Sequence, residues 1–131
     1  MTQFGNEDSV NALRLSANKK IVTIVLVDHV LQFTFMDGSI LSLADDGQLC
    51  CESRYMTSDD NFKNFIGGNL LGISLEDAPS VSSSEEDNVH DVQFLHVKTS
   101  KGSFTVENHV EHNGYYSGFD ICAQLILPQE K

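Results

Sequence analysis

An Asp37–Gly38 dipeptide between two alternating segments is the sequence feature that most constrains the fold. The segment before it places Leu31, Phe33 and Phe35 on one side and polar residues on the other, as in a strand with one buried face. An Asp-Gly pair favours a tight hairpin turn, because glycine adopts positive φ without steric cost. Residues 39–44 then form the returning strand. This region therefore predicts an antiparallel hairpin at the centre of a β-rich domain.

The rest of the chain repeats this pattern. The almost wholly apolar segment 21–27 predicts a central strand covered on both faces. A short helix is expected over residues 7–17 with Val10, Leu13 and Ala17 on one stripe, and a second one begins after Asn61. We expect an α+β fold: one domain, mainly an antiparallel sheet of about six or seven strands with one or two short helices packed on it. The remaining strands are expected at 69–75, 89–99, 103–109 and 119–127.

The length of 131 residues suits a single domain, 1–131, with its own core. Residues 1–19 are predicted as an N-terminal helical extension, 77–88 as a flexible acidic loop and 128–131 as a tail. No apolar run approaches the roughly 20 residues that span a bilayer, and the N-terminus is acidic rather than basic. We therefore expect a cytoplasmic protein whose cysteines are thiols.

The net charge is −11, from 19 acidic and 8 basic residues. Such a surface repels nucleic acid and anionic membranes, so we expect neither as a direct partner. A basic protein partner is favoured because opposite charge accelerates encounter, although ordinary solubility explains the same charge. The clustered acids lack the spacing of a calcium loop. As a group they are candidates for contacting a basic groove: Asp45, Asp46, Glu76, Asp77, Glu85, Glu86 and Asp87.

Residues 107–116 form a predicted strand-to-loop segment with binding chemistry. His109 and His112, with a neighbouring glutamate, are the residue types that hold a divalent metal, but their spacing is not that of a strong zinc motif. Asn113 and Gly114 are typical of a turn. Adjacent tyrosines in such a loop cannot both be buried on one strand face. We therefore expect Tyr115 and Tyr116 to contribute a partner contact.

A second polar segment precedes Tyr55. A thiol nucleophile at residues 50–51 requires a nearby base, and buried cysteine is the commoner state. Arg54 is expected to pair internally with Glu52 or Asp59, although its planar fork also suits a carboxylate or phosphate ligand. No catalytic motif, metal or cofactor is predicted, so a binding protein is favoured over an enzyme. The alternative small-ligand site comprises Cys51, Glu52, Arg54, His109, Glu111, His112 and Asn113, with Tyr115.

Four stretches carry a family resemblance: residues 50–60 (CCESRYMTSDD), 67–73 (GGNLLGI), 92–106 (VQFLHVKTSKGSFTV) and 111–119 (EHNGYYSGF). They resemble a family of unknown function found mostly in phages, prophages and other mobile elements. The resemblance implies a small accessory protein of such an element. It leads to the hypothesis of an anti-CRISPR-like inhibitor that occupies a basic nucleic-acid-binding surface of a host protein or nucleoprotein, with a homodimer also possible. The alternatives are a nucleotide-signal sponge, a thiol/His enzyme or a structural virion component.

Overall fold

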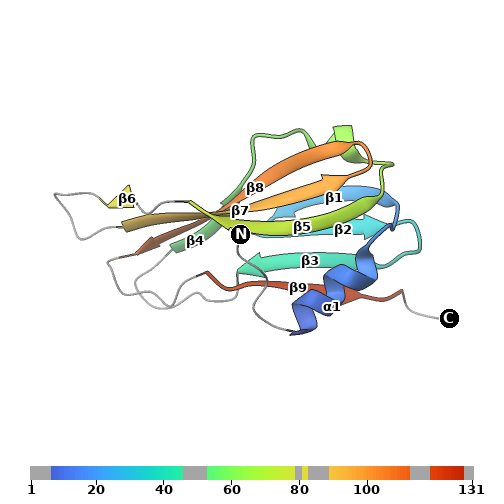
Figure 1. Cartoon of the computed structure of the whole chain (residues 1–131), viewed down its shortest axis with the longest axis horizontal. Helices are drawn as coiled ribbons and strands as arrows, with labels where there is room; N and C mark the ends of the chain where they lie inside the picture. The colour runs from blue at the N-terminus through green and yellow to red at the C-terminus, as the bar shows by residue number, and fades with distance from the viewer. Residues whose placement is uncertain (1–6, 46–52, 79–80, 83–88, 113–118, 129–131) are drawn as a thin grey trace.

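The fold consists of two antiparallel sheets with one α-helix beside them (Figure 1). The computed structural model describes residues 7–45, 53–78, 81–82, 89–112 and 119–128. The elements in these ranges are α1 (Glu7–Ser16), β1 (Ile21–Val27), β2 (Val30–Phe35), β3 (Ile40–Asp45), β4 (Ser53–Thr57), the 3₁₀ helix η1 (Phe62–Phe65), β5 (Leu70–Asp77), β6 (Val81–Ser82), β7 (Val89–Thr99), β8 (Gly102–His112) and β9 (Ile121–Ile126).

The strands are ordered β1-β2-β3-β9 in the first sheet and β4-β8-β7-β5 in the second, with the short β6 on β7. The sheets pack through one core, in which Phe33 of β2 lies 6.3 Å from Phe104 of β8 between ring centroids. The expectation of an antiparallel domain is confirmed. A single sheet of six or seven strands was the wrong architecture, because the second sheet covers the apolar face that we assigned to helices. The described fold is mainly β rather than α+β.

The predicted hairpin over residues 30–44 is present as β2 and β3. Leu31, Phe33 and Phe35 are buried as their alternation requires, and Phe33 lies opposite Leu41. The turn between the two strands contains Gly38 at φ 89°, a conformation that glycine adopts without steric cost. The period of two therefore identified the buried face of this sheet correctly.

The helix α1 lies beside β9, at one edge of the sandwich, instead of covering a sheet. Ser9 and Ala12 face inward, and the Ser9 hydroxyl oxygen accepts a hydrogen bond of 2.8 Å from the Ala123 amide on β9. The predicted stripe was partly wrong: Leu13 packs against the core, but Val10 is exposed. Ser9, rather than an apolar residue, is buried at this position because its hydroxyl pairs with an amide of the edge strand β9. A buried amide without a hydrogen bond would be costly.

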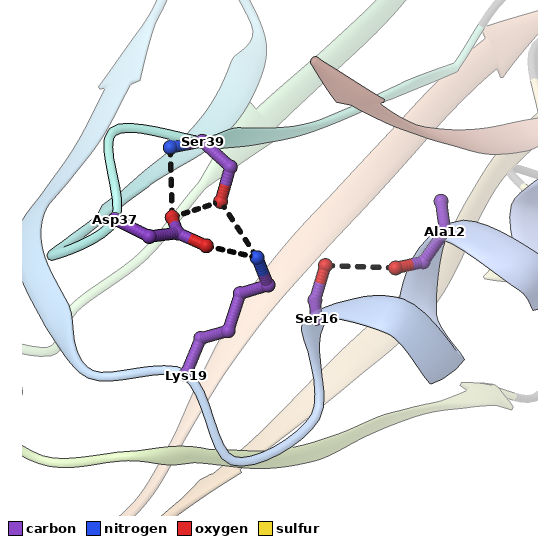
Figure 2. Close-up of polar contacts among 5 residues, drawn as sticks. All are labelled: Ala12, Ser16, Lys19, Asp37 and Ser39. Carbon is purple, nitrogen blue, oxygen red and sulfur yellow. Dashed lines mark hydrogen bonds and ion pairs between the residues drawn. The ribbon is translucent and has the colours of Figure 1, made fainter. Parts of the chain in front are cut away.

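The two sheets are joined by backbone hydrogen bonds where β1 and β5 begin. The Ile21 amide donates to Gly68 O and the Gly67 amide donates to Ile21 O, both at 2.8 Å. At the same end Lys19 pairs with Asp37, whose carboxylate also accepts a 2.8 Å hydrogen bond from the Ser39 amide (Figure 2). These contacts fix the β2–β3 turn against the start of β1.

Three further expectations are corrected. The segment 21–27 is an edge strand, β1, and Val22, Val25 and Val27 are exposed. The strand β4 lies in a region without visible alternation, and β8 continues to His112, three residues beyond the strand end expected at His109. No helix in the described part of the chain is long and apolar enough to cross a membrane.

Candidate functional site

The described lysines gather at one end of the sandwich, whereas eight of the thirteen described carboxylates lie toward the other. We call the end with the β7–β8 turn, η1 and the start of β1 the lysine end. It carries all five lysines of the described residues: Lys19, Lys20, Lys63, Lys98 and Lys101.

The opposite end, where β3 and β8 finish and β7 and β9 begin, we call the acidic end. Within the described ranges, Arg54 is the only lysine or arginine that lies there. The described residues next to the stretches 46–52, 83–88 and 113–118 also lie at this end. The acidic end carries eight described carboxylates: Asp28, Asp45, Glu76, Asp77, Asp91, Glu107, Glu111 and Asp120.

A buried ion pair joins the two sheets beneath the acidic end. Arg54 Nη1 on β4 donates to Asp45 Oδ1 on β3 at 2.7 Å, and each side chain is only 3% exposed. Asn108 Nδ2 on β8 donates to the second oxygen, Asp45 Oδ2, at 2.8 Å. Because both carboxylate oxygens accept from the opposite sheet, Asp45 fixes the distance between β3 and β8. Its carboxylate is therefore structural and is not presented to a partner.

Two amide side chains continue this polar interior. Asn108 on β8 lies opposite Gln93 on β7, and both are buried. Gln93 Nε2 donates to Asp77 Oδ1 at 2.7 Å, while the Asn108 amide nitrogen is held by Asp45. The two carboxylates thus orient both amides and leave Asn108 Oδ1 and Gln93 Oε1 as buried acceptors with no hydrogen-bond partner among the described residues. The core is therefore apolar toward the lysine end and polar toward the acidic end.

The outer face of the second sheet carries a cluster of rings at the acidic end. The rings of Tyr55 on β4 and His109 on β8 are nearly parallel, at 10°, with centroids 4.6 Å apart. His90 on β7 follows, and its Nε2 lies 2.9 Å from His109 Nδ1. His29, from the β1–β2 turn, lies edge-on to Tyr55, with ring centroids 6.4 Å apart. We call these four residues the ring ladder.

Burial and neighbouring charges alter two groups of the ring ladder. Desolvation, and then the nearby His90, hold the pKa of His109 below its ordinary value, although Glu107 and Glu111 act in the opposite direction. Desolvation, and then a hydrogen bond with Glu111, raise the pKa of Tyr55, so that its hydroxyl keeps its proton. Both shifts favour the uncharged forms of Tyr55 and His109, which lie beside the carboxylates of Glu107 and Glu111.

The predicted ligand constellation is divided by the second sheet. Arg54 lies opposite Val110 on the inner face, whereas His109 lies opposite Tyr55 on the outer face, so the structure does not bring Arg54 and His109 together. Arg54 pairs internally, as predicted, but its described partner is Asp45 and not Asp59, and Glu52 lies outside the described residues. No group of three His, Cys, Asp or Glu side chains in the described residues is arranged to hold a metal ion.

The other predicted site residues are divided between the acidic end and undescribed positions. Glu76 and Asp77 are exposed on β5, and Glu111 is exposed on β8. His112 ends β8, but only its backbone is described. The remaining predicted residues lie outside the described ranges: Asp46, Cys51, Glu52, Glu85, Glu86, Asp87, Asn113, Tyr115 and Tyr116.

Sequence reasoning missed Asn108, Gln93 and the His90–His109 contact. A signal was present for Asn108, because it alternates with Val106 and Val110 and so occupies an inward position. No comparable signal existed for His90 and His109, whose contact depends on the register of β7 against β8.

One protein-family model matches the chain, over residues 14–121, and it is described as a domain of unknown function, DUF7448. The match spans β1 to β8 with the last three residues of α1, and it ends at the first residue of β9. No curated protein and no solved structure matches the chain.

Proposed function

We propose that this chain, which belongs to the DUF7448 family, is a small acidic binding protein whose acidic end occupies a basic, nucleic-acid-binding surface of a host protein or nucleoprotein. In this proposal a phage or other mobile element encodes the protein, which acts in the host cytoplasm against a defence system, as anti-CRISPR proteins do. It is not an enzyme, needs no cofactor and binds no nucleic acid directly. The observation that supports the proposal is the segregation of charge between the acidic and lysine ends.

Segregation matters because a uniform negative charge serves solubility alone, whereas a one-sided charge orients the molecule toward a positive surface. The acidic end presents exposed carboxylates on different strands, including Glu76 on β5 and Glu111 on β8. Strands in a sheet are held about 4.8 Å apart, so these carboxylates keep fixed separations before binding. A pre-organised array loses little conformational entropy when it meets lysines and arginines.

The buried layer contributes to the same proposal. The Asp45–Arg54 pair and the Asn108 amide hold β3, β4 and β8 together directly beneath the charged surface. Because this layer connects the two sheets, the surface carboxylates of the second sheet are fixed relative to the first. The interior is thus interpreted as a support, and the exposed carboxylates as the contact.

A pair of matched charge-reversal variants tests the proposal. The acidic-end variant carries Glu76→Lys, Glu111→Lys and Asp120→Lys; the control carries Glu7→Lys, Asp8→Lys and Asp59→Lys, which are exposed residues on α1 and before η1. Each reversal changes the charge by two, so both triples bring the net charge from −11 to −5. Host proteins captured by the wild-type chain should be lost from the acidic-end variant and kept by the control. Equal capture by both triples would exclude the acidic end as the contact surface.

A further inference from the structure

The contact between His90 and His109 requires that at least one of the two imidazoles lacks a proton on the contacting nitrogen. A 2.9 Å separation between His90 Nε2 and His109 Nδ1 is a hydrogen bond, in which one nitrogen donates and the other accepts. An imidazole that accepts at a ring nitrogen carries no proton there, so at least one of the two rings must be neutral. If both rings were protonated, two N–H groups and two positive charges would meet at this distance.

The His109 ring is enclosed by its neighbours and cannot easily rotate to a new hydrogen-bond partner. Its side chain is only 12% exposed, with Tyr55 stacked on one face. Its other nitrogen, Nε2, lies 2.8 Å from Thr57 Oγ1 and 3.5 Å from Glu107 Oε2. A protonated His109 is satisfied at Nε2 but not at Nδ1, unless His90 is neutral and accepts from it.

We infer that the His90–His109 pair is a pH-sensitive latch, closed while one imidazole is neutral and opened when both are protonated. The ring ladder connects the β1–β2 turn of the first sheet with β4, β8 and β7 of the second, so opening the latch loosens the outer face of the acidic end. Protonation also adds positive charge among the carboxylates that we propose as the contact surface. Acidification therefore lowers the affinity for a basic partner, and this consequence rests on the proposed function.

The titratable groups that face the latch come from every element packed against it. Glu107 and Glu111 on β8 favour protonation of His109, and His29, from the β1–β2 turn, lies against Tyr55. Desolvation and the mutual repulsion of the two imidazoles oppose it, and together they outweigh the glutamates at His109. Arg54 is on the inner face, and His96 is paired with Glu76 at 2.9 Å farther along the sheet.

The latch is tested first by NMR of the histidine rings between pH 8 and pH 4.5. In the wild-type chain, the two rings should titrate as a coupled pair, with one protonation step below the ordinary histidine value of about 6.5. His90→Gln retains a hydrogen-bonding side chain without an ionisable ring, so the pKa of His109 should move upward. His96→Gln, on the same face but outside the ring ladder, should change neither step. Independent titration of the two rings, or an unchanged His109 pKa in His90→Gln, would overturn the latch.

The functional consequence is tested separately with a labelled oligolysine peptide, measured by fluorescence anisotropy at pH 7.5 and pH 5.5. Wild-type affinity should fall by up to about five-fold for each imidazole that gains a proton, which is the upper limit for an exposed charge contact. The double variant His90→Gln/His109→Gln should lose most of this dependence, whereas His96→Gln should keep it. An identical pH dependence in the double variant would refute control of binding by the latch. If the wild-type chain fails to bind the peptide at pH 7.5, the proposed function fails, and the NMR titration still decides whether the latch exists.

Discussion

Replacing Asp45 with alanine should destabilise the protein more than any replacement of an exposed carboxylate. The Asp45 side chain is 3% exposed, accepts from Arg54 at 2.7 Å and accepts from Asn108 at 2.8 Å. Asp45→Ala removes the carboxylate that faces a buried guanidinium, and breaking such a pair costs about 3–5 kcal/mol. A domain of this size is stable by about 5–15 kcal/mol, so the loss is a large fraction of the total. Urea unfolding followed by circular dichroism at pH 7 measures it.

Two further variants separate the ion pair from general damage to the core. Asp45→Leu combined with Arg54→Met replaces both charges by apolar groups of similar size, and such replacements are often neutral. The double variant should therefore be more stable than Asp45→Ala, although it contains two core changes. Asp59→Ala, at an exposed position, should unfold like the wild type. A loss below about 1 kcal/mol in Asp45→Ala, or a double variant less stable than it, would refute the reasoning.

Three other predictions concern stability. Folding lowers the pKa of His109, so as pH falls the unfolded chain is protonated at this position before the folded chain is. The stability of the protein should therefore fall as pH drops below about 6.5. His109→Gln should flatten the dependence of the melting temperature on pH between pH 7.5 and pH 5.5. The pKa of Asp37 is also lowered, chiefly by its hydrogen bond with Lys19, so its contribution to stability is lost only as pH falls below about 3.8. The difference in melting temperature between Asp37→Asn and the wild type should therefore be smaller at pH 3 than at pH 7. An equal difference at the two pH values would contradict the pairing. Phe104→Ala removes a buried ring that contacts Phe33, Phe62 and Phe65, and should cost about 3–5 kcal/mol in urea unfolding; a cost below about 1 kcal/mol would place Phe104 outside the core.

Local patterns predicted the strands with a single buried face. Leu31, Phe33 and Phe35 alternate cleanly, and their hairpin is formed as β2 and β3. The same rule failed for β1, because an edge strand with exposed valines has the composition of a central one. It also failed for β4, whose inward residue Arg54 is charged and gives no apolar signal. Burial of Arg54 depends on Asp45, which comes from the other sheet.

The candidate site was less accessible to sequence reasoning for the same physical reason. The excess of acids was evident from composition, but the position of eight of them toward one end depends on strand direction and pairing. Grouping Asp45 with the surface acids was natural in the sequence, yet Asp45 points inward and the ion pair fixes it there. The contact between His90 and His109 exists only in the observed register of β7 and β8. Residues near in sequence were therefore poor guides to residues near in space.

Capture of partners from host lysate by the two charge-reversal triples tests the central claim most directly, because both triples have the same net charge of −5 and differ only in where the charge is changed. Mass spectrometry of the captured proteins should show basic proteins or nucleoproteins with the wild-type chain and with the Glu7/Asp8/Asp59 variant, and not with the Glu76/Glu111/Asp120 variant. The same proteins retained by the Glu76/Glu111/Asp120 variant would contradict the assignment of the acidic end as the binding surface.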